Sequence, residues 1–147
     1  MNHWDQIVRQ HGPAVCATAW RILGDATEME GVVREVFGQA HEIARSGPVH
    51  CWEVLLRRLA ANVALDRLRQ RRPSEGRERG AAGRLRSALA RLPGREAAVF
   101  ALRYFDDLST REIAETLLLS RSTVKACLRL ARGELEVLLA QAPPVAG

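Results

Sequence analysis

The sequence has few of the features that mark a membrane protein or an exported protein. No run of 18 apolar residues occurs, and the first ten residues, MNHWDQIVRQ, lack the apolar stretch of a signal peptide. Aromatic residues make up only 5% of the chain, and lysine occurs once. We therefore expect a cytoplasmic protein that does not insert into a membrane.

The sequence also lacks the patterns that organise catalytic and metal sites. There is no phosphate-binding P-loop, no GxGxxG and no GxSxG, and the four histidines are scattered along the chain. Cys16, Cys51 and Cys127 are far apart, which favours neither a disulfide framework nor a zinc site and predicts buried thiols. We expect no enzymatic activity, no catalytic residue, no cofactor and no metal.

Positive charge is unevenly distributed along the 147 residues. The net charge is +5, and residues 46–92 hold 11 basic and only 4 acidic residues. Such a local excess indicates a surface that binds a polyanion, although a solvated basic face next to a linker would give the same composition. With 47% hydrophobic residues, the chain has the composition of an ordinary folded protein.

Apolar residues recur at helical spacing in the N-terminal half of the chain. The pattern predicts helices over residues 13–23, 26–43 and 51–72, and alternating strand patterns are missing. Gly24-Asp25 separates the first two helices, and the loop RSGPVH (45–50) separates the second from the third. These three helices form the first predicted unit.

The second half of the chain is also predicted to be helical. RPSEGRERGAAG (72–83) has the composition of a linker, and four helical patterns follow it. The predicted fold is therefore all-α, with two small helical domains. Its expected divisions are a three-helix domain at 1–72, a short linker at 73–83 and a four-helix domain at 84–142.

The last two helical patterns predict a helix-turn-helix. STRE (109–112) is a capping box, and Ser120 is a plausible N-cap for the next helix. Leu118 stands in the turn where glycine is usual, but the Ser120 cap and the break between the apolar stripes 113/114/117 and 124/128/131 both require the chain to turn there. The second helix would carry a polar outer face suited to phosphates and base edges, formed by Arg121, Ser122, Lys125, Arg129 and Arg132. A helical hairpin with a solvated outer face is the alternative.

A polar stripe along the third predicted helix indicates a second nucleic-acid surface. It lies opposite the apolar side of that helix and consists of Arg58, Asn62, Asp66 and Arg69. Asparagine is suited to base edges and arginine to phosphates, on duplex or single strands. A surface helix stabilised by an Arg–Asp pair is the alternative.

Three segments in order resemble a bacterial RNA polymerase sigma factor of the extracytoplasmic-function type. RILGDATEMEGVVREVFGQA (21–40) is similar to the family's polymerase-docking helix, and LLRRLAANVALDRLRQRR (55–72) to its helix facing the −10 promoter element. Residues 89–135 resemble region 4, which binds the −35 element. The resemblance implies promoter-specific transcription initiation by a nucleoid-associated protein. Its implied partners are core RNA polymerase, double-stranded and locally melted promoter DNA, and an anti-sigma factor.

The resemblance also implies three groups of binding residues. Contacts with core polymerase are expected from Glu30, Val33, Arg34, Glu35 and Phe37. Contacts with the −10 element are expected from Ser46, His50, Arg58, Asn62, Asp66 and Arg69. Contacts with the −35 element are expected from Arg121, Ser122, Thr123, Lys125, Arg129 and Arg132.

Several positions depart from the family's pattern. Gly31 and Arg34 replace an acidic residue and a glutamine in the docking helix, and Cys127 and Leu130 stand where arginines are common. The linker of 11 residues reaches at most about 36–40 Å, whereas one DNA turn is already about 34–36 Å. These departures leave two alternatives open: a sigma-like interaction protein that has lost promoter use, and a simple helix-turn-helix repressor.

Overall fold

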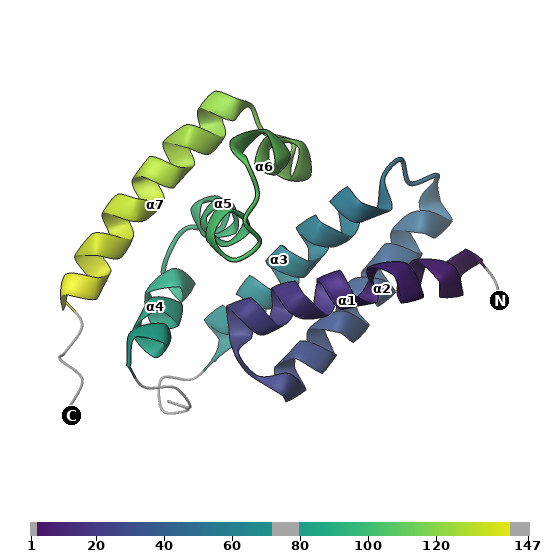
Figure 1. The fold of residues 1–147 in the computed structure, drawn as a ribbon, viewed down its shortest axis with the longest axis horizontal. Helices are drawn as coiled ribbons and strands as arrows, with labels where there is room; N and C mark the ends of the chain where they lie inside the picture. Colours follow the sequence, from purple (N-terminus) through teal and green to yellow (C-terminus); the bar gives the residue numbers. More distant parts are fainter. Residues whose placement is uncertain (1–2, 72–79, 142–147) are drawn as a thin grey trace.

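The structure is a computed structural model that describes residues 3–71 and 80–141. Within these residues it contains seven α-helices and no strand, so the all-α prediction is confirmed, with three helices followed by four (Figure 1). None of the described helices is long and apolar enough to cross a membrane. The helices are α1 (His3–Leu23), α2 (Ala26–Ser46), α3 (Trp52–Gln70), α4 (Ala81–Ala90), α5 (Gly94–Tyr104), α6 (Thr110–Leu117) and α7 (Arg121–Gln141).

The first helix begins ten residues before its predicted start. Pro13 lies inside α1, where a proline removes one backbone hydrogen bond, so the segment before it looked unfavourable for helix. Packing outweighs this cost, because Ile7 is buried and Trp4 meets the rings of Phe37 and Trp52 at centroid distances of 6.2 and 5.8 Å. The apolar stripe of α1 therefore continues through Pro13 towards the N-terminus.

The turn between α1 and α2 forms where it was predicted. Gly24 has a φ of +63°, a left-handed conformation that glycine adopts without steric cost. Asp25 then caps α2, since its carboxylate accepts a hydrogen bond from the Glu28 amide at 2.8 Å. The two residues together reverse the chain direction.

The predicted linker is shorter on its C-terminal side than its composition suggested. Gly80 is the N-cap of α4, and residues 81–83 are already helical. The preceding part of the linker prediction, residues 72–79, lies outside the described residues. Alanines at positions 81 and 82 explain the difference, because alanine has the highest helix propensity and outweighs Gly83.

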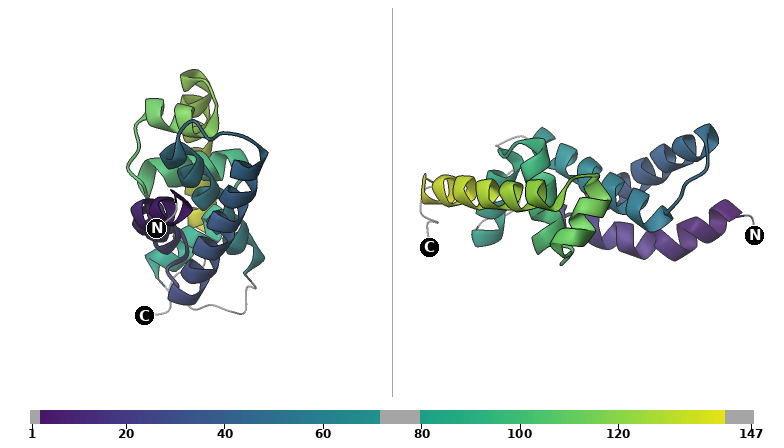
Figure 2. Two further views of the ribbon diagram at one scale, coloured as in Figure 1. Left: turned by 90° about the vertical axis from the view of Figure 1, so that its right-hand side faces the viewer. Right: turned by 90° about the horizontal axis from the view of Figure 1, so that it is seen from above.

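The two groups of helices pack together through two clusters of buried residues, and α3 contributes to both. One cluster of buried residues draws on α1 to α5 and on α7, and the second joins Ala61 of α3 to residues of α5, α6 and α7. Helix α3 contacts α1 and α2 as well as α4, α5 and α6 (Figures 1 and 2). Because α3 packs against both groups of helices, its own buried residues lie on more than one side of the helix.

Candidate nucleic-acid interface

The helix-turn-helix prediction is confirmed in its local geometry. The Ser109 hydroxyl accepts a hydrogen bond from the Glu112 amide at 3.1 Å, and the Glu112 carboxylate accepts one from the Ser109 amide at 3.0 Å. The Ser120 hydroxyl likewise accepts a hydrogen bond from the Thr123 amide at 3.1 Å and so caps α7. Both helices therefore begin at the residues that the sequence indicated.

Leu118 makes the turn between α6 and α7 in the left-handed conformation, with φ 58° and ψ 46°. The amide of Leu119 donates to the carbonyl of Ala114 at 3.0 Å, which closes the end of α6. The Leu118 side chain is 77% exposed. The turn thus forms without glycine, at a steric cost that its own side chain does little to offset.

We expect Leu118→Gly to raise the free energy of unfolding by about 0.5–1 kcal/mol. Relief of the left-handed conformation contributes about 1–2 kcal/mol, and the greater freedom of glycine in the unfolded chain removes part of this gain. Leu118→Ala is the control, because it removes the same exposed side chain but keeps the strained backbone. Urea denaturation checks both variants, and a less stable glycine variant would contradict this account of the turn.

The outer face of α7 is polar and exposed, as the helix-turn-helix requires. Val124, Leu128 and Ala131 of the same helix are buried in the core. The six predicted −35 contacts stand elsewhere on the helix, all exposed except the half-buried Thr123: Arg121, Ser122, Thr123, Lys125, Arg129 and Arg132. This separation leaves the amino-terminal turns of α7 open to a DNA groove.

Cys127 and Arg132 of α7 each make contacts within the protein. Cys127 is buried, so an arginine at this position would have to leave the core before it could reach DNA. Arg132 is held in place by Tyr104, whose hydroxyl accepts from its Nε at 2.6 Å and whose ring lies 5.5 Å from its Cζ. The thiol prediction holds for Cys127 but not for Cys51, which is exposed in the loop before α3, nor fully for half-buried Cys16.

The polar stripe on α3 is present, with one member less accessible than the others. Asn62, Asp66 and Arg69 are exposed, whereas Arg58 is half-buried. Arg69 Nη1 lies 3.0 Å from Asp66 Oδ1, which is the Arg–Asp pair of the alternative interpretation. An exposed pair of this kind contributes only about 0.3–0.5 kcal/mol, so Arg69 can exchange it for a phosphate.

The loop expected to lie near the −10 element begins at the end of α2. Ser46 is the last residue of this helix, and its hydroxyl donates to the Glu42 carbonyl at 3.3 Å. His50 is exposed in the segment that leads into α3. The structure therefore places both side chains at the surface near the amino-terminal end of α3.

The predicted polymerase-binding residues of α2 divide into exposed and buried members. Glu30, Arg34 and Glu35 are exposed and Val33 is half-buried. Phe37 is buried against Trp4, so its predicted direct contact with a partner does not fit this conformation. Its ring instead packs inside the helical bundle, because it falls on the same face of α2 as Val36 and Ala40.

Gly31 has a structural reason that the sequence comparison missed. The guanidinium group of Arg67, from α3, lies over this glycine, and a Cβ added at Gly31 would be 2.7 Å from Arg67 Nη1. Arg67 Nη2 also lies 3.9 Å from Glu35 Oε1. Loss of the side chain at position 31 therefore lets α3 present a positive charge on the face of α2 that holds Glu35.

A pair of carboxyl groups joins α5 to α7. Burial raises the pKa of Glu96, and the hydrogen bond and negative charge of Glu134 raise it further. Because a raised pKa means that the folded protein disfavours the ionised carboxylate, Glu96 lowers stability as the pH rises through that pKa.

Across the described residues, no group of three histidine, cysteine or acidic side chains is placed to hold a metal ion.

We expect Glu96→Gln to raise the melting temperature at pH 7, because glutamine carries no charge to desolvate. The gain should shrink as the pH falls below the ordinary glutamate pKa of 4.5, where the wild-type carboxyl is protonated in both states. Glu136→Gln, on the exposed side of α7, is the control. Melting curves between pH 4 and pH 8 check this, and an unchanged gain at every pH would contradict it.

In comparisons with known proteins, the chain is similar to sigma factors. Residues 82–135 match the family model described as sigma-70, region 4. Over 162 aligned residues the chain is 26% identical to the ECF RNA polymerase sigma factor SigE of Mycolicibacterium smegmatis; the match covers 96% of this chain but only 63% of that protein. The chain therefore spans less than two thirds of the length of this curated relative.

Two solved structures have a similar fold. One is CnrH in complex with the cytosolic domain of CnrY, with a TM-score of 0.66, 28% identity and coverage of 95% of this chain and 89% of that chain. The other is the sigma factor RpoE of Bartonella quintana in complex with the anti-sigma factor NepR, with a TM-score of 0.61 and 16% identity. It covers 97% of this chain and all of that chain, and at this identity the likeness concerns the fold.

Proposed function

We propose that this chain, which carries a sigma-70 region 4 domain at residues 82–135 and is similar to an extracytoplasmic-function sigma factor, binds core RNA polymerase and directs it to promoters. The observation that carries the proposal is a capped helix-turn-helix whose second helix exposes arginine, serine and lysine on its outer face. The polar stripe on α3 would supply a second nucleic-acid surface on the same chain. A protein of this kind would act in the cytoplasm on nucleoid DNA, without catalysing a reaction itself.

The two surfaces would have different tasks. The amino-terminal part of α7 would enter the major groove of the −35 element, where Lys125 and Arg129 reach base edges and Arg121 holds a phosphate. The exposed side of α3, with Asn62 and Arg69, would hold the melted −10 strand. Ser46 and His50 would complete this second surface from the loop before α3.

The proposed domain division follows the same roles. Residues 1–72 would bind core polymerase and the −10 element, residues 73–83 would connect the domains, and residues 84–142 would bind the −35 element. Glu30, Arg34 and Glu35 form an exposed charged surface on α2 that a polymerase could dock on. An anti-sigma factor, as in the RpoE complex with NepR, would be a further partner.

A pull-down with core RNA polymerase tests the docking part of the proposal. The wild-type protein should be retained, and Glu30→Ala should weaken retention because it removes an exposed charge from the docking surface. Glu42→Ala, which removes an exposed glutamate from the last turns of the same helix, is the matched control. Absence of wild-type retention would contradict the proposal.

One observation favours a second candidate, a sigma-like protein that binds a regulator but not the polymerase. The guanidinium of Arg67 covers Gly31 on the docking helix, and Arg34 adds a further positive charge there. A partner adapted to an acidic docking helix would meet the opposite charge at this surface. Retention on a regulator without any retention on core polymerase would favour this candidate.

A further inference from the structure

Helix α7 has a second apolar stripe, on its solvent side. The residues of α7 that face the core are buried and recur in alternating steps of four and three residues: Val124, Leu128, Ala131 and Leu135. The same spacing repeats two residues further along the chain, in the solvent-side stripe formed by Ala126, Leu130, Gly133, Val137 and Ala140. Leu130 and Val137 are each 55% exposed. The helix therefore carries two heptad patterns, of which only one is used by the core.

The position of α7 in the fold leaves the solvent-side stripe open. Helix α7 lies along one edge of the molecule and packs against α4, α5 and α6 (Figure 1). Gly133, in the middle of the stripe, is exposed, and a Cβ added there would meet nothing within 4 Å. Glycine destabilises the interior of a helix relative to alanine, and no contact in the described part of the chain requires it here. A glycine at such a position allows a second helix to approach closely.

The stripe is complementary to itself when two copies of α7 lie antiparallel. Leu130 of one chain then faces Gly133 of the other, and Val137 faces Ala126, so that each layer joins a large side chain to a small residue. A parallel pair would set Leu130 against Leu130 and Gly133 against Gly133. Crowded layers would then alternate with empty layers, which neither side chain nor backbone could fill well.

Charged residues beside the stripe favour the same antiparallel register. Arg129 and Glu136 are both exposed and lie on the same flank of the stripe. In the register that joins Leu130 to Gly133, Arg129 of each chain lies beside Glu136 of the other, so this ion pair forms twice. A shift of one heptad would set Arg129 against Arg129 or Glu136 against Glu136, which is repulsive.

We propose that two copies of this chain associate through antiparallel α7 helices, in a symmetric dimer that buries the solvent-side stripe. The two-fold arrangement follows from the stripe and its charges, which supply both halves of every contact. A single pair of helices buries less than about 1,200 Å², the size of transient interfaces. The dimer should therefore have a dissociation constant of about 10–100 µM.

The dimer withholds the recognition helix from DNA. The major groove is about 12 Å wide, and one α-helix with its side chains is already about 10–12 Å across. With a second helix beside it, α7 no longer fits into the groove, and Arg129 is engaged by Glu136 of the other chain. This consequence for DNA rests on the proposed function, whereas the pairing of the helices does not.

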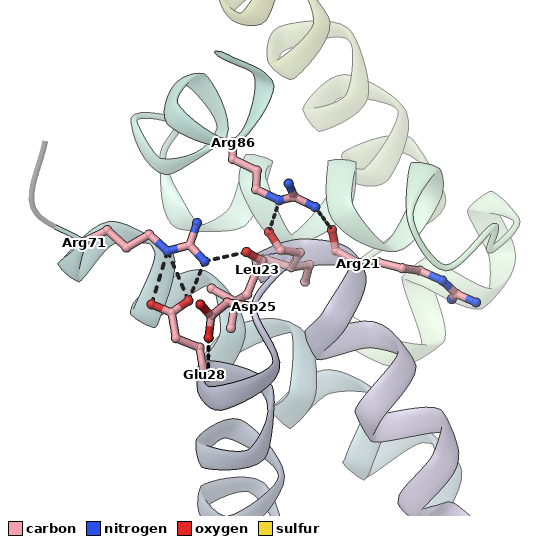
Figure 3. Close-up of polar contacts among 7 residues, drawn as sticks. Arg21, Leu23, Asp25, Glu28, Arg71 and Arg86 are labelled. Carbon is pink, nitrogen blue, oxygen red and sulfur yellow. Dashed lines mark hydrogen bonds and ion pairs between the residues drawn. The ribbon is translucent and has the colours of Figure 1, made fainter. Parts of the chain in front are cut away.

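A test of the dimer uses the full chain, because the helices around α7 are tied to the N-terminal helices. Arg86 of α4 donates to the Ile22 and Arg21 carbonyls of α1 at 2.9 and 3.1 Å (Figure 3). Asp106, in the turn between α5 and α6, accepts hydrogen bonds from the Thr18 hydroxyl at 2.9 and 3.1 Å. In sedimentation equilibrium between about 5 and 500 µM, the mean mass of the wild type should rise from 16.3 kDa towards twice that value.

Substitutions in the stripe should weaken the dimer. Leu130→Gln/Val137→Gln should raise the dissociation constant at least about tenfold, because four apolar side chains of the dimer lose their burial. Leu139→Gln is the control, since Leu139 is 37% exposed on another side of α7. A wild type that stays at 16.3 kDa, or a control that weakens the dimer as much as the double variant, would overturn the proposal.

An exchange of charges tests the antiparallel register. Arg129→Glu should raise the dissociation constant about threefold to tenfold, because the new carboxylate meets Glu136 of the other chain. Arg129→Glu/Glu136→Arg restores opposite charges and should return the constant to within about twofold of the wild type. A double variant without recovery would overturn the antiparallel arrangement, because a parallel pair sets Arg129 beside Glu134 instead.

Binding to a labelled duplex of random sequence at low salt tests whether the dimer excludes DNA. Leu130→Gln/Val137→Gln should half-saturate the duplex at about half the protein concentration that the wild type needs, because more of the variant is monomeric. Equal or tighter binding by the wild type would overturn the exclusion of DNA. If neither form binds the duplex, the result counts against the proposed function, while sedimentation still judges the dimer.

Discussion

Replacement of both Lys125 and Arg129 with alanine is expected to lower the affinity for the −35 element at least about 30-fold. Each side chain stands on the exposed face of α7, where a base-edge contact contributes about 1–3 kcal/mol. The core face of the helix, with Val124 and Leu128, is untouched. Fluorescence anisotropy with labelled duplex DNA measures this loss directly.

Salt dependence separates DNA contact from a general loss of charge. Arg121→Ala, which removes the proposed phosphate contact, should make the dependence of affinity on salt shallower by about one unit of slope. Arg9→Ala/Arg45→Ala removes two exposed positive charges from α1 and α2 and should leave the −35 affinity nearly unchanged. Equal losses in the two double variants would mean that α7 is not the recognition helix.

Ile113→Ala should lower the free energy of unfolding by about 2–5 kcal/mol. Ile113 lies on α6, and its side chain is fully buried against the neighbouring helices. Removal of three carbon atoms leaves a cavity that the surrounding helices fill only in part. A loss of this size is a large fraction of the 5–15 kcal/mol by which most domains are stable. Chemical denaturation followed by circular dichroism gives the value.

Val137→Ala is the control for this core substitution. Val137 also lies on a helix of the C-terminal group, but its side chain is 55% exposed on α7. Its replacement should change stability by less than about 0.5 kcal/mol. If Val137→Ala and Ile113→Ala destabilise equally, the packing of α6 described above is wrong.

Local features of the fold followed from local sequence. Ser109 and Glu112 announce a helix start because a hydroxyl and a carboxylate three residues apart can satisfy each other's amides. Ser120 caps α7 through its hydroxyl alone, and this cap, together with the break between the two apolar stripes, indicates the turn at Leu118 despite its side chain. Helical periodicity predicted the number and order of the described helices, because each helix repeats its apolar residues within its own segment of the sequence.

Features that depend on distant contacts were not predictable from the sequence. Helix α3 contacts both groups of helices. Its apolar residues do not show in the sequence whether the helix packs against one group or against both. Arg86 and Asp106 look like ordinary surface charges until the fold brings them to α1. Gly31 appeared to be a lost acidic residue, and the guanidinium of Arg67 that lies over it comes from another helix.

The site predictions had a similar limit. Periodicity separated the exposed from the buried face of α7 correctly for Lys125 and Arg129, but a family resemblance does not state which side chains are accessible. Phe37 illustrates this, since its ring packs against Trp4 inside the bundle. The tie between Arg132 and Tyr104 had no sequence signal, because the two residues lie on different helices.

Run-off transcription with purified core RNA polymerase and a library of genomic promoter fragments tests the central claim most directly. The wild-type protein should produce transcripts with defined start sites, and Lys125→Ala/Arg129→Ala should reduce them strongly at equal protein concentration. Core polymerase alone should produce none of these transcripts. Failure of the wild-type protein to support initiation on any fragment would contradict the claim that it acts as a sigma factor. The result would instead favour a sigma-like interaction protein.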